Sequence, residues 1–469
     1  MGNPRLLAAL RDAVASRIVP LVRHSALRPG FASAARGYRG GLALRAEAAA
    51  LEPAARADRA LAALRDAARA AGDAVPFWRE RFRRAGFDWR SPFTMDEFRS
   101  LPPLERSDVI AAGDSIVSPF ADPARLIRDA TGGSTGEPLR FALSPEERGF
   151  VDAGLEWHYR SLGCAPARRT ALFYGGEADP LVPAGFSRRA KNWATNVVAI
   201  PCFRIDSAVL ERAHRAFDRF APDLLVAYAS AAERLALHLR ERNVRASYPR
   251  VALVTGAERL SPEGRATIDS VFAARARERY GSREIGLIAC ETNRPGDALR
   301  VDLEHVVAEP EGEPRREDGL APLLVSTLRS RTMPLFRYRI GDLARFDERH
   351  RAGSAGLHAS LLAVTGRAMD FLVRKDGGLV HPVELPHFFK DLPVREFQAV
   401  QSDGGEVVVS VVAAPGFSPA HRERIRDVIA RNLRGYPVTV LEVDAIARNA
   451  SAKLRPVVSA LARERAAVS

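Results

Sequence analysis

Glycine, serine and threonine fill six consecutive positions of the chain, Thr131-Gly-Gly-Ser-Thr-Gly136. Glycines let backbone N–H groups turn toward an anion, and the hydroxyls of Ser134 and Thr135 add hydrogen-bond donors or a contact to a metal ion. The segment is therefore typical of a loop that holds phosphate groups. For the segment taken alone, an ordinary hairpin turn is an equally good interpretation.

The same segment also fits the G-x-S-x-G pattern of hydrolases, in which Ser134 would attack an acyl carbonyl. That chemistry needs a helix directly after the serine. Here Pro138 follows, and then residues 139–143 have the composition of a strand. The predicted context is strand, loop, strand, which disfavours a nucleophilic serine.

Two carboxylates lie where they could contact a nucleotide. Glu284 belongs to Tyr280-Gly-Ser-Arg-Glu-Ile-Gly286, where we expect an arginine-rich helix to end at the Tyr-Gly pair. Its oxygens could coordinate a hard cation, although a surface carboxylate at a helix end is the alternative. Asp342 follows the apolar run 333–336 and is predicted at a turn after a strand. There it could accept hydrogen bonds from two ribose hydroxyls, or cap the turn.

Lysine is rare in this chain, because only four of its 70 lysines and arginines are lysine: Lys191, Lys375, Lys390 and Lys453. Arginine is therefore the default cation. Lys453 in Ala452-Lys-Leu-Arg-Pro456 indicates a need for a compact ammonium group. The alternative is a frayed, charged segment near the end of the chain.

The elements that would position these residues change in character along the chain. Residues 1–105 are predicted to be a helical region, with apolar residues at helical spacing and an aromatic cluster between residues 77 and 87. Thr94, with Glu97 three residues later, has the pattern of a capping box. Residues 106–368 alternate strand-like runs (171–174, 196–200, 224–228 and 251–255) with helices, the pattern of parallel βαβ units.

Residues 369–469 are predicted to be a small α+β domain. A strand is expected over 406–414, a helix over 418–433 and another strand over 437–443. The boundary near residues 366–372 depends on this change of pattern and on the segment Gly366-Arg-Ala-Met-Asp-Phe-Leu372.

Composition excludes several classes of protein. With 469 residues, 46% of them apolar, the chain can bury a full core, and no run approaches the roughly 18 apolar residues of a membrane span. Residues 5–23 lack a signal-peptide core, so we expect a cytoplasmic protein. Three distant cysteines exclude a disulfide framework and disfavour a zinc ribbon. The net charge of +13 is spread evenly, which disfavours nucleic acid and membranes as partners.

In order, the five segments that begin at Thr131, Tyr280, Arg337, Gly366 and Ala452 resemble the adenylate-forming (acyl-CoA synthetase and ligase) superfamily. Within it, the chain is similar to the phenylacetate-coenzyme A ligase family, in the branch of capsular polysaccharide biosynthesis and coenzyme F390 synthetase. The resemblance extends from residues 75–82 through Thr255-Gly-Ala-Glu258 to Lys453.

The resemblance implies an α/β fold: a large N-terminal domain of βαβ-type layered sheets with a helical N-terminal region, and a small mobile α+β C-terminal domain. It also implies a set of sites. The β- and γ-phosphates of ATP would be held by Thr131, Gly132, Gly133, Ser134, Thr135 and Gly136. The adenine would be lined by Gly256, Ala257, Glu258, Tyr280 and Gly281. Glu284 and Thr135 would hold Mg2+, and Asp342 and Arg367 would bind the ribose. Asp370 would be the hinge of the C-terminal domain. Lys453 would stabilise charge during catalysis.

The implied reaction is ATP-dependent activation of a small organic acid, aromatic or other, to an acyl adenylate, followed by transfer to coenzyme A. An amine or a carrier-protein thiol is the alternative acceptor. The chain departs from the family pattern at the first two loop positions, where Thr131 and Gly132 replace serines. It also has Glu137 where the family has lysine, and Ala452 in place of glycine. These departures keep open a catalytically reduced nucleotide-binding protein.

Overall fold

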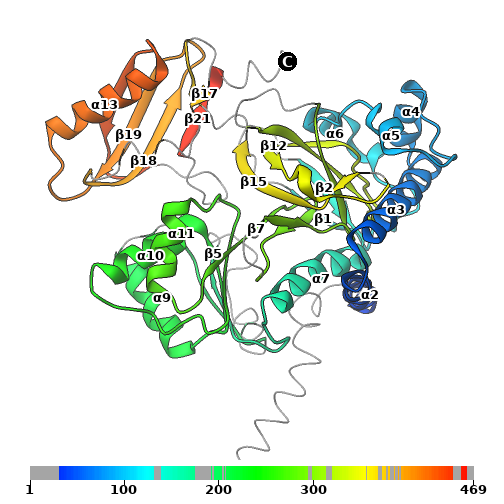
Figure 1. Ribbon diagram of the computed structural model, residues 1–469, viewed down its shortest axis with the longest axis horizontal. Coiled ribbons are helices and arrows are strands. Elements are labelled where there is room, and N and C mark those ends of the chain that lie inside the picture. The colour runs from blue at the N-terminus through cyan, green and yellow to red at the C-terminus, as the bar shows by residue number, and fades with distance from the viewer. Residues whose placement is uncertain are drawn as a thin grey trace, which may run out of the picture. The chain divides into compact units, whose positions relative to one another are not determined.

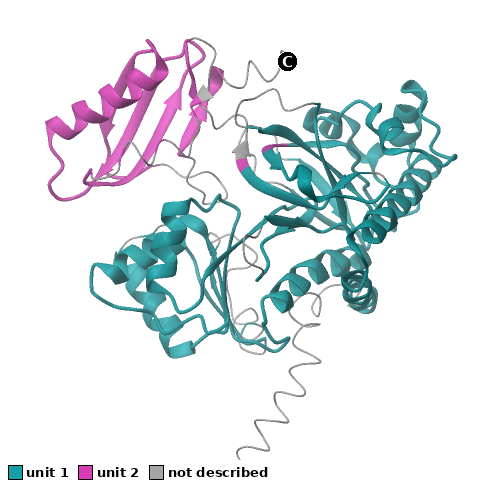
Figure 2. Ribbon diagram, in the orientation of Figure 1, with its two compact units in different colours: residues 1–340, 344–364 teal, residues 341–343, 365–469 magenta. Residues whose placement is uncertain are grey.

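The computed structural model describes residues 31–130, 139–174, 192, 195–202, 205, 207–293, 298–312, 319–354, 356–367, 372–375, 379–380, 385, 389, 392–446 and 456–461. The chain divides into two compact units (Figure 2). One contains residues 1–340 and 344–364, and the other contains residues 341–343 and 365–469. Within the described residues, no helix combines the length and the apolar character that a membrane crossing requires.

The N-terminal part of the first unit is helical, as its sequence predicts. The Thr94 side chain accepts a hydrogen bond from the Glu97 backbone and forms the expected capping box. The aromatic residues enter the core, where the indole of Trp78 donates a 2.9 Å hydrogen bond to the Pro334 carbonyl. The helical elements are α2 (Phe31–Ala49), α3 (Pro53–Ala74), α4 (Pro76–Arg84), α5 (Met95–Arg99), α6 (Arg106–Ala112) and the 3-10 helix η1 (Gly113–Ile116).

Half of a large eleven-stranded sheet is parallel. Its strands lie in the order β4-β3-β5-β6-β7, and each pairs in parallel with its neighbour, as the βαβ pattern predicts. These strands are β3 (Thr170–Phe173), β4 (Val197–Ile200), β5 (Leu224–Tyr228), β6 (Ala252–Gly256) and β7 (Ala276–Ser282). The helices between and beside them are α7 (Pro145–Ser161), α9 (Ser207–Phe220), α10 (Ala229–Arg240) and α11 (Pro262–Val271).

Helices cover both faces of this parallel half. Leu225 and Ala227 of β5 belong to the core formed with α9, α10 and α11, which lie together on one side in Figure 1. Leu224 and Val226, which point the other way, pack with Tyr159 of α7. Successive residues of a strand face opposite sides, so an apolar run such as Leu224–Tyr228 is what a doubly covered strand requires.

Beyond β7 the first unit contains antiparallel pairs, among them β7–β8, β8–β9, β9–β15 and β10–β11. The large sheet continues from β7 in the order β8-β9-β15-β12-β11-β10, and two short hairpins stand apart from it. The strands of this part of the sheet are β8 (Gly286–Cys290), β9 (Leu299–Val301), β10 (Val306–Pro310), β11 (Ala321–Thr327), β12 (Tyr338–Phe346) and β15 (Ser360–Arg367). One hairpin consists of β1 (Ile127–Ala130) and β2 (Arg140–Leu143), and the other of β13 (Arg351–Ala352) and β14 (Leu357–His358). The 3-10 helix η2 spans Glu348–His350.

The second unit has its own core. Its main sheet has the order β20-β19-β18-β21, and Val407, Val409 and Val411 of β19 pack against α13. The strand and helix expected over 406–414 and 418–433 are therefore present. Its elements are β16 (Leu372–Val373), β17 (Leu379–Val380), β18 (Val394–Gln401), β19 (Val407–Ala413), α13 (Pro419–Leu433), β20 (Val438–Glu442) and β21 (Val457–Ser459). The predicted α/β fold with a C-terminal α+β unit is confirmed.

Candidate functional site

The parallel strands create a switch point between β3 and β5. From β3 the chain passes to β4 on one side and then to β5 on the other, and such points, at the carboxyl ends of the strands, are where open α/β sheets bind ligands. Tyr174 follows β3 directly, and Tyr228 ends β5. Their ring centroids are 4.0 Å apart. The switch point therefore has an aromatic wall.

The next strand in the sheet, β6, carries three of the expected residues at its carboxyl end: Gly256, Ala257 and Glu258. Ala257 has a positive φ of 65°, so the chain turns sharply there. The Glu258 carboxylate accepts a 2.9 Å hydrogen bond from the backbone N–H of Ser230, in the first turn of α10. Glu258 therefore stabilises a helix N-terminus, and one of its oxygens is already used.

Tyr280 and Gly281 lie on strand β7, so the expected arginine-rich helix ending at this pair is wrong. The strand pairs with β6 on one side and β8 on the other, and these pairings override the helical character of the local composition. A side chain on Gly281 would place its Cβ 2.1 Å from the Gly286 carbonyl oxygen. Glycine is required there because the two strands of the hairpin approach closely.

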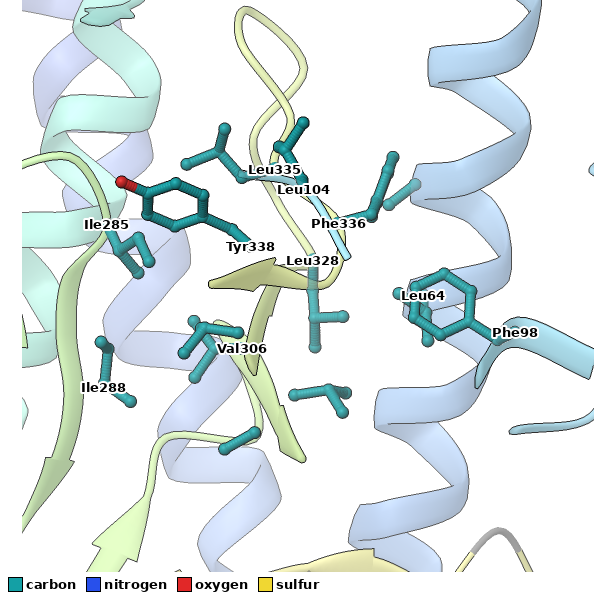
Figure 3. Packing of buried hydrophobic residues seen from close by; sticks show 14 of the residues in the cluster. Leu64, Phe98, Leu104, Ile285, Ile288, Val306, Leu328, Leu335, Phe336 and Tyr338 are labelled. Carbon is teal, nitrogen blue, oxygen red and sulfur yellow. The ribbon is translucent and has the colours of Figure 1, made fainter. Parts of the chain in front are cut away.

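Glu284 lies in the tight turn between β7 and β8. The Ser282 hydroxyl accepts a 3.3 Å hydrogen bond from the Ile285 backbone N–H, and Ile285 itself is buried in the core, as Figure 3 shows. Glu284 is half-buried and lines a small cavity with Phe150 and His305. It forms no hydrogen bond or ion pair with any residue that the structure describes. The turn is thus fixed while its carboxylate stays available.

An ion pair ties this turn to the hairpin that carries the Gly/Ser/Thr segment. The guanidinium of Arg283 donates two hydrogen bonds of 2.9 Å to the Asp129 carboxylate on β1. The strands β1 and β2 pair up to Ala130 and Arg140, and they enclose residues 131–139. The turn that contains Glu284 is therefore held beside β1, the strand that precedes Thr131.

The two strands expected on either side of Ser134 are present, as β1 and β2. Helix α7 begins only at Pro145, after β2. A nucleophile elbow would need a helix directly after the serine. Thr131, Gly132, Gly133, Ser134, Thr135 and Gly136 themselves lie outside the described residues, as does Glu137.

The remaining expected residues belong to the second unit. Asp342 lies within β12 and not at a turn after a strand, which corrects that expectation; the neighbouring Gly341 has a φ of 91° that bends the strand. Arg367 is the last residue of β15. Asp370, Ala452 and Lys453 lie outside the described residues.

Two further side chains on or near β7 have strongly shifted pKa values. Burial, with the repulsion of Glu291, raises the pKa of Glu278 to about 7. Burial, with the positive charge of Arg279, lowers the pKa of His158 to about 3. Perturbed groups of this kind concentrate at functional sites, although buried ion networks also produce them. Among the described residues there is no cluster of three or more His, Cys, Asp or Glu side chains suited to a metal ion.

Sequence reasoning missed three of the residues that organise this region: Asp129, Arg283 and Arg279. Arg279 precedes Tyr280 directly, and Arg283 precedes Glu284. Both were hidden by the abundance of arginine, which makes a single arginine uninformative. Their roles depend on partners more than 100 positions away in sequence, Tyr159 for Arg279 and Asp129 for Arg283.

Comparison with known proteins agrees with this architecture. Residues 372–460 match the model of the CapK C-terminal domain. Protein CapK of Staphylococcus aureus is 25% identical over 322 residues, 68% of this chain and 70% of that protein. The phenylacetate-coenzyme A ligase of Thermus thermophilus is 25% identical over 370 residues, 76% of this chain and 80% of that protein.

Solved structures give the same result for the fold. A 2-hydroxyisobutyryl-CoA ligase, in its postadenylation state with an acyl-AMP, superposes with a TM-score of 0.64 at 17% identity, over 87% of this chain and 90% of the ligase. The predicted resemblance to the adenylate-forming ligases is thereby confirmed: CapK and phenylacetate-coenzyme A ligase are homologues, and the fold is that of acyl-CoA ligases. These relatives support the interpretation of the chain as an AMP-forming ligase.

Proposed function

We propose that this chain, a relative of the adenylate-forming ligases, activates a carboxylic acid with ATP and transfers the acyl group to coenzyme A. In the first step a carboxylate oxygen attacks the α-phosphorus of ATP, and pyrophosphate leaves. In the second step a thiolate sulfur attacks the acyl carbonyl, and AMP leaves. The observation that supports the proposal most strongly is the Arg283–Asp129 pair, because it joins the Glu284 turn to β1, the strand that precedes residues 131–136 in the chain.

The proposed nucleotide contacts follow the strand order of the sheet. Residues 131–136 would bind the β- and γ-phosphates, with backbone N–H groups as donors. Gly256, Ala257, Glu258 and Tyr280, at or near the ends of β6 and β7, would line the adenine. Because Glu258 already binds the N-terminus of α10, we assign the contact at this position to the backbone.

Magnesium fits the donor set at the glutamate turn. Mg2+ keeps several waters and takes only one or two carboxylates together with substrate phosphates. Glu284 supplies one such carboxylate, and its oxygens are not used by other described residues. The neighbouring Glu147 is committed, because its oxygens accept hydrogen bonds from the backbone N–H groups of Ser144, Arg331 and Thr332. Glu284, with Thr135, would hold the ion, which would neutralise phosphate charge.

No side chain needs to act as a nucleophile in this reaction. The protein contributes by orienting the two substrates and by placing donors where negative charge develops. Asp342 and Arg367 would bind the ribose, and Lys453 would stabilise charge on the α-phosphate and acyl oxygens. These assignments are carried over from the matching motifs.

The test is pyrophosphate release on mixing the protein with Mg-ATP and each member of a panel of carboxylic acids, with and without coenzyme A. We expect at least one acid to give release, and coenzyme A to convert the adenylate into a thioester. Hydroxylamine, which traps acyl adenylates, separates the two steps. Product formation with an amine or a carrier protein, but not with coenzyme A, would show that the acyl acceptor is not coenzyme A. ATP binding without any release would indicate a catalytically reduced protein and overturn the proposal.

A further inference from the structure

We propose that Arg279 binds a second carboxylate of the substrate, and that the preferred substrates are therefore dicarboxylic acids. This inference deepens the proposed function and depends on it. It assigns a recognition residue to the acyl part of the substrate, which none of the motifs above identifies.

Arg279 lies beside the proposed nucleotide site and on the α7 face of the sheet. A Cβ on Gly256 would lie 3.0 Å from both Cγ and Nε of Arg279, so the arginine side chain passes directly over the end of β6. Glu278 and Tyr280 alternate with it along the strand and therefore face the other side. Tyr159 of α7 covers Arg279, with its ring centroid 6.0 Å from the guanidinium carbon.

The guanidinium has only neutral partners among the described residues. It donates hydrogen bonds to the hydroxyls of Tyr159 and Tyr174, and it forms no ion pair with an aspartate or glutamate of the described chain. Two fully buried arginines do have such a partner: Arg45 pairs with Asp302 at 2.6 Å, and Arg168 with Glu156 at 2.9 Å. Arg279 is only partly exposed, and shielding a cation from water without a counter-ion is costly, which makes Arg279 a suitable site for an anion.

His158, which also lies beside Arg279, supplies no counter-ion for it. Its Nε2 lies 3.1 Å from the Glu291 carbonyl oxygen, which can only accept, so Nε2 carries the proton. Its Nδ1 is buried and has no hydrogen-bond partner in the described part of the chain, and the residue is only 1% exposed. The charge of Arg279 contributes to lowering the pKa of this imidazole. His158 is therefore neutral and adds no compensating charge, only an unused acceptor.

The surroundings select for a distal carboxylate more than for an uncharged group. Tyr174 is half-buried and lies against Tyr228 at the switch point, where it would contact the carbon skeleton of an acid. The two oxygens of a carboxylate would then accept hydrogen bonds from Arg279 in place of one or both tyrosine hydroxyls. A guanidinium group binds the paired oxygens of a carboxylate especially well. The reacting carboxylate would lie toward Glu284.

The experiment compares pairs of acids that differ only in a terminal methyl or carboxylate: butyrate with succinate, and 4-methylbenzoate with terephthalate. Pyrophosphate release is measured for the wild-type protein, Arg279→Gln, Arg279→Lys and the control Arg277→Gln, which removes a charge two residues away on the same face of β7. We expect the wild type to prefer the dicarboxylate in at least one pair. Arg279→Gln should raise KM for that dicarboxylate roughly ten- to a hundredfold, while kcat/KM for its monocarboxylate partner stays the same or rises.

Arg279→Lys should recover part of the loss, and Arg277→Gln should behave as the wild type. Thermal unfolding of each variant shows whether the fold is intact. A wild-type preference for the monocarboxylate in every pair would overturn this inference and leave the proposed function standing. An equal loss with both members of a pair in Arg279→Gln would show that the arginine acts on the reacting carboxylate or on the fold, and would also overturn it. Failure of the wild type with every acid would instead refute the proposed function.

Discussion

Glu284 is the residue on which the proposed chemistry depends most. Its turn is fixed by Ser282 and Ile285, so replacing the carboxylate by an amide should leave the backbone in place. We predict that Glu284→Gln lowers the rate of adenylate formation by about ten- to a hundredfold, since a charge-assisted contact contributes about 1.5–3 kcal/mol.

The measurement is pyrophosphate release at increasing Mg2+ concentration. A variant that has lost a metal ligand should be partly rescued by more Mg2+. Glu146→Gln, an exposed acidic residue on α7, is the control. Wild-type ATP kinetics in Glu284→Gln would show that this carboxylate does not act on the nucleotide.

Glu278 gives a prediction about stability and pH. Burial and the neighbouring Glu291 raise the pKa of Glu278 from its ordinary value of 4.5 to about 7 in the folded protein. The folded state therefore holds a proton that the unfolded state releases between about pH 4.5 and pH 7. By linkage, the contribution of this group is fully present below about pH 4.5 and is lost as the pH rises through about 7.

We expect Glu278→Gln to remove this part of the pH dependence, which is worth on the order of 2–3 kcal/mol. Urea unfolding at several pH values from about 5 to about 8 measures it. The wild type should lose stability relative to the variant as the pH rises. Parallel curves for the two proteins would mean that Glu278 titrates normally in the folded state.

At the scale of elements, the site depends on two hairpins that are far apart in sequence. The β1–β2 hairpin carries the glycine-rich segment, and the β7–β8 hairpin carries Glu284. Asp129 and Arg283 join them through side chains that are 38% and 50% exposed. Exposed ion pairs contribute only about 0–1 kcal/mol to stability, so the pair has a small effect on folding and its importance lies in position.

We predict that Asp129→Ala and Arg283→Ala each reduce kcat/KM for ATP several-fold, with little change in melting temperature. The double variant should lose no more than either single variant, because one shared contact is removed in all three. Arg128→Ala is the matched control, since Arg128 is on the same strand and pairs with Asp114, away from the glutamate turn. Additive losses in the double variant would show that the two residues act separately.

Local patterns in the sequence predicted where most helices and strands lie, but they did not always distinguish a strand from a helix. The capping box at Thr94 depends on a neighbour three residues away, so it could be recognised directly. Strand β7 was mistaken for a helix because Arg-Glu-Arg has helical composition and its strand partners are distant. The Arg279–Tyr159 contact depends on the crossing of α7 over the sheet, which no local pattern contains.

At the scale of the whole molecule, the chain has two compact units, and the proposed residues are divided between them. Glu284 and residues 131–136 belong to the first unit, and Lys453 belongs to the second. The motifs for both could be found in the sequence because each is a short contiguous segment.

This division leads to a prediction about the two half-reactions. If Lys453 stabilises charge while pyrophosphate leaves, it serves adenylation, because attack on the α-phosphorus and loss of pyrophosphate occur only in that step. If Asp370 is the hinge, its backbone must rotate between the steps. Lys453→Ala should therefore abolish pyrophosphate release yet still transfer the acyl group from a synthetic acyl adenylate to coenzyme A.

Asp370→Pro should show the opposite behaviour, because proline fixes φ and removes a backbone donor. It should release pyrophosphate in a first turnover and transfer the acyl group slowly. Asp370→Ala is the control, since it removes the carboxylate without restricting the backbone. Both half-reactions are assayed separately, by pyrophosphate release in a single turnover and by thioester formation from the prepared adenylate. Equal loss of both activities in Lys453→Ala and in Asp370→Pro would mean that the two residues do not divide the steps, and that residue 370 is not the hinge.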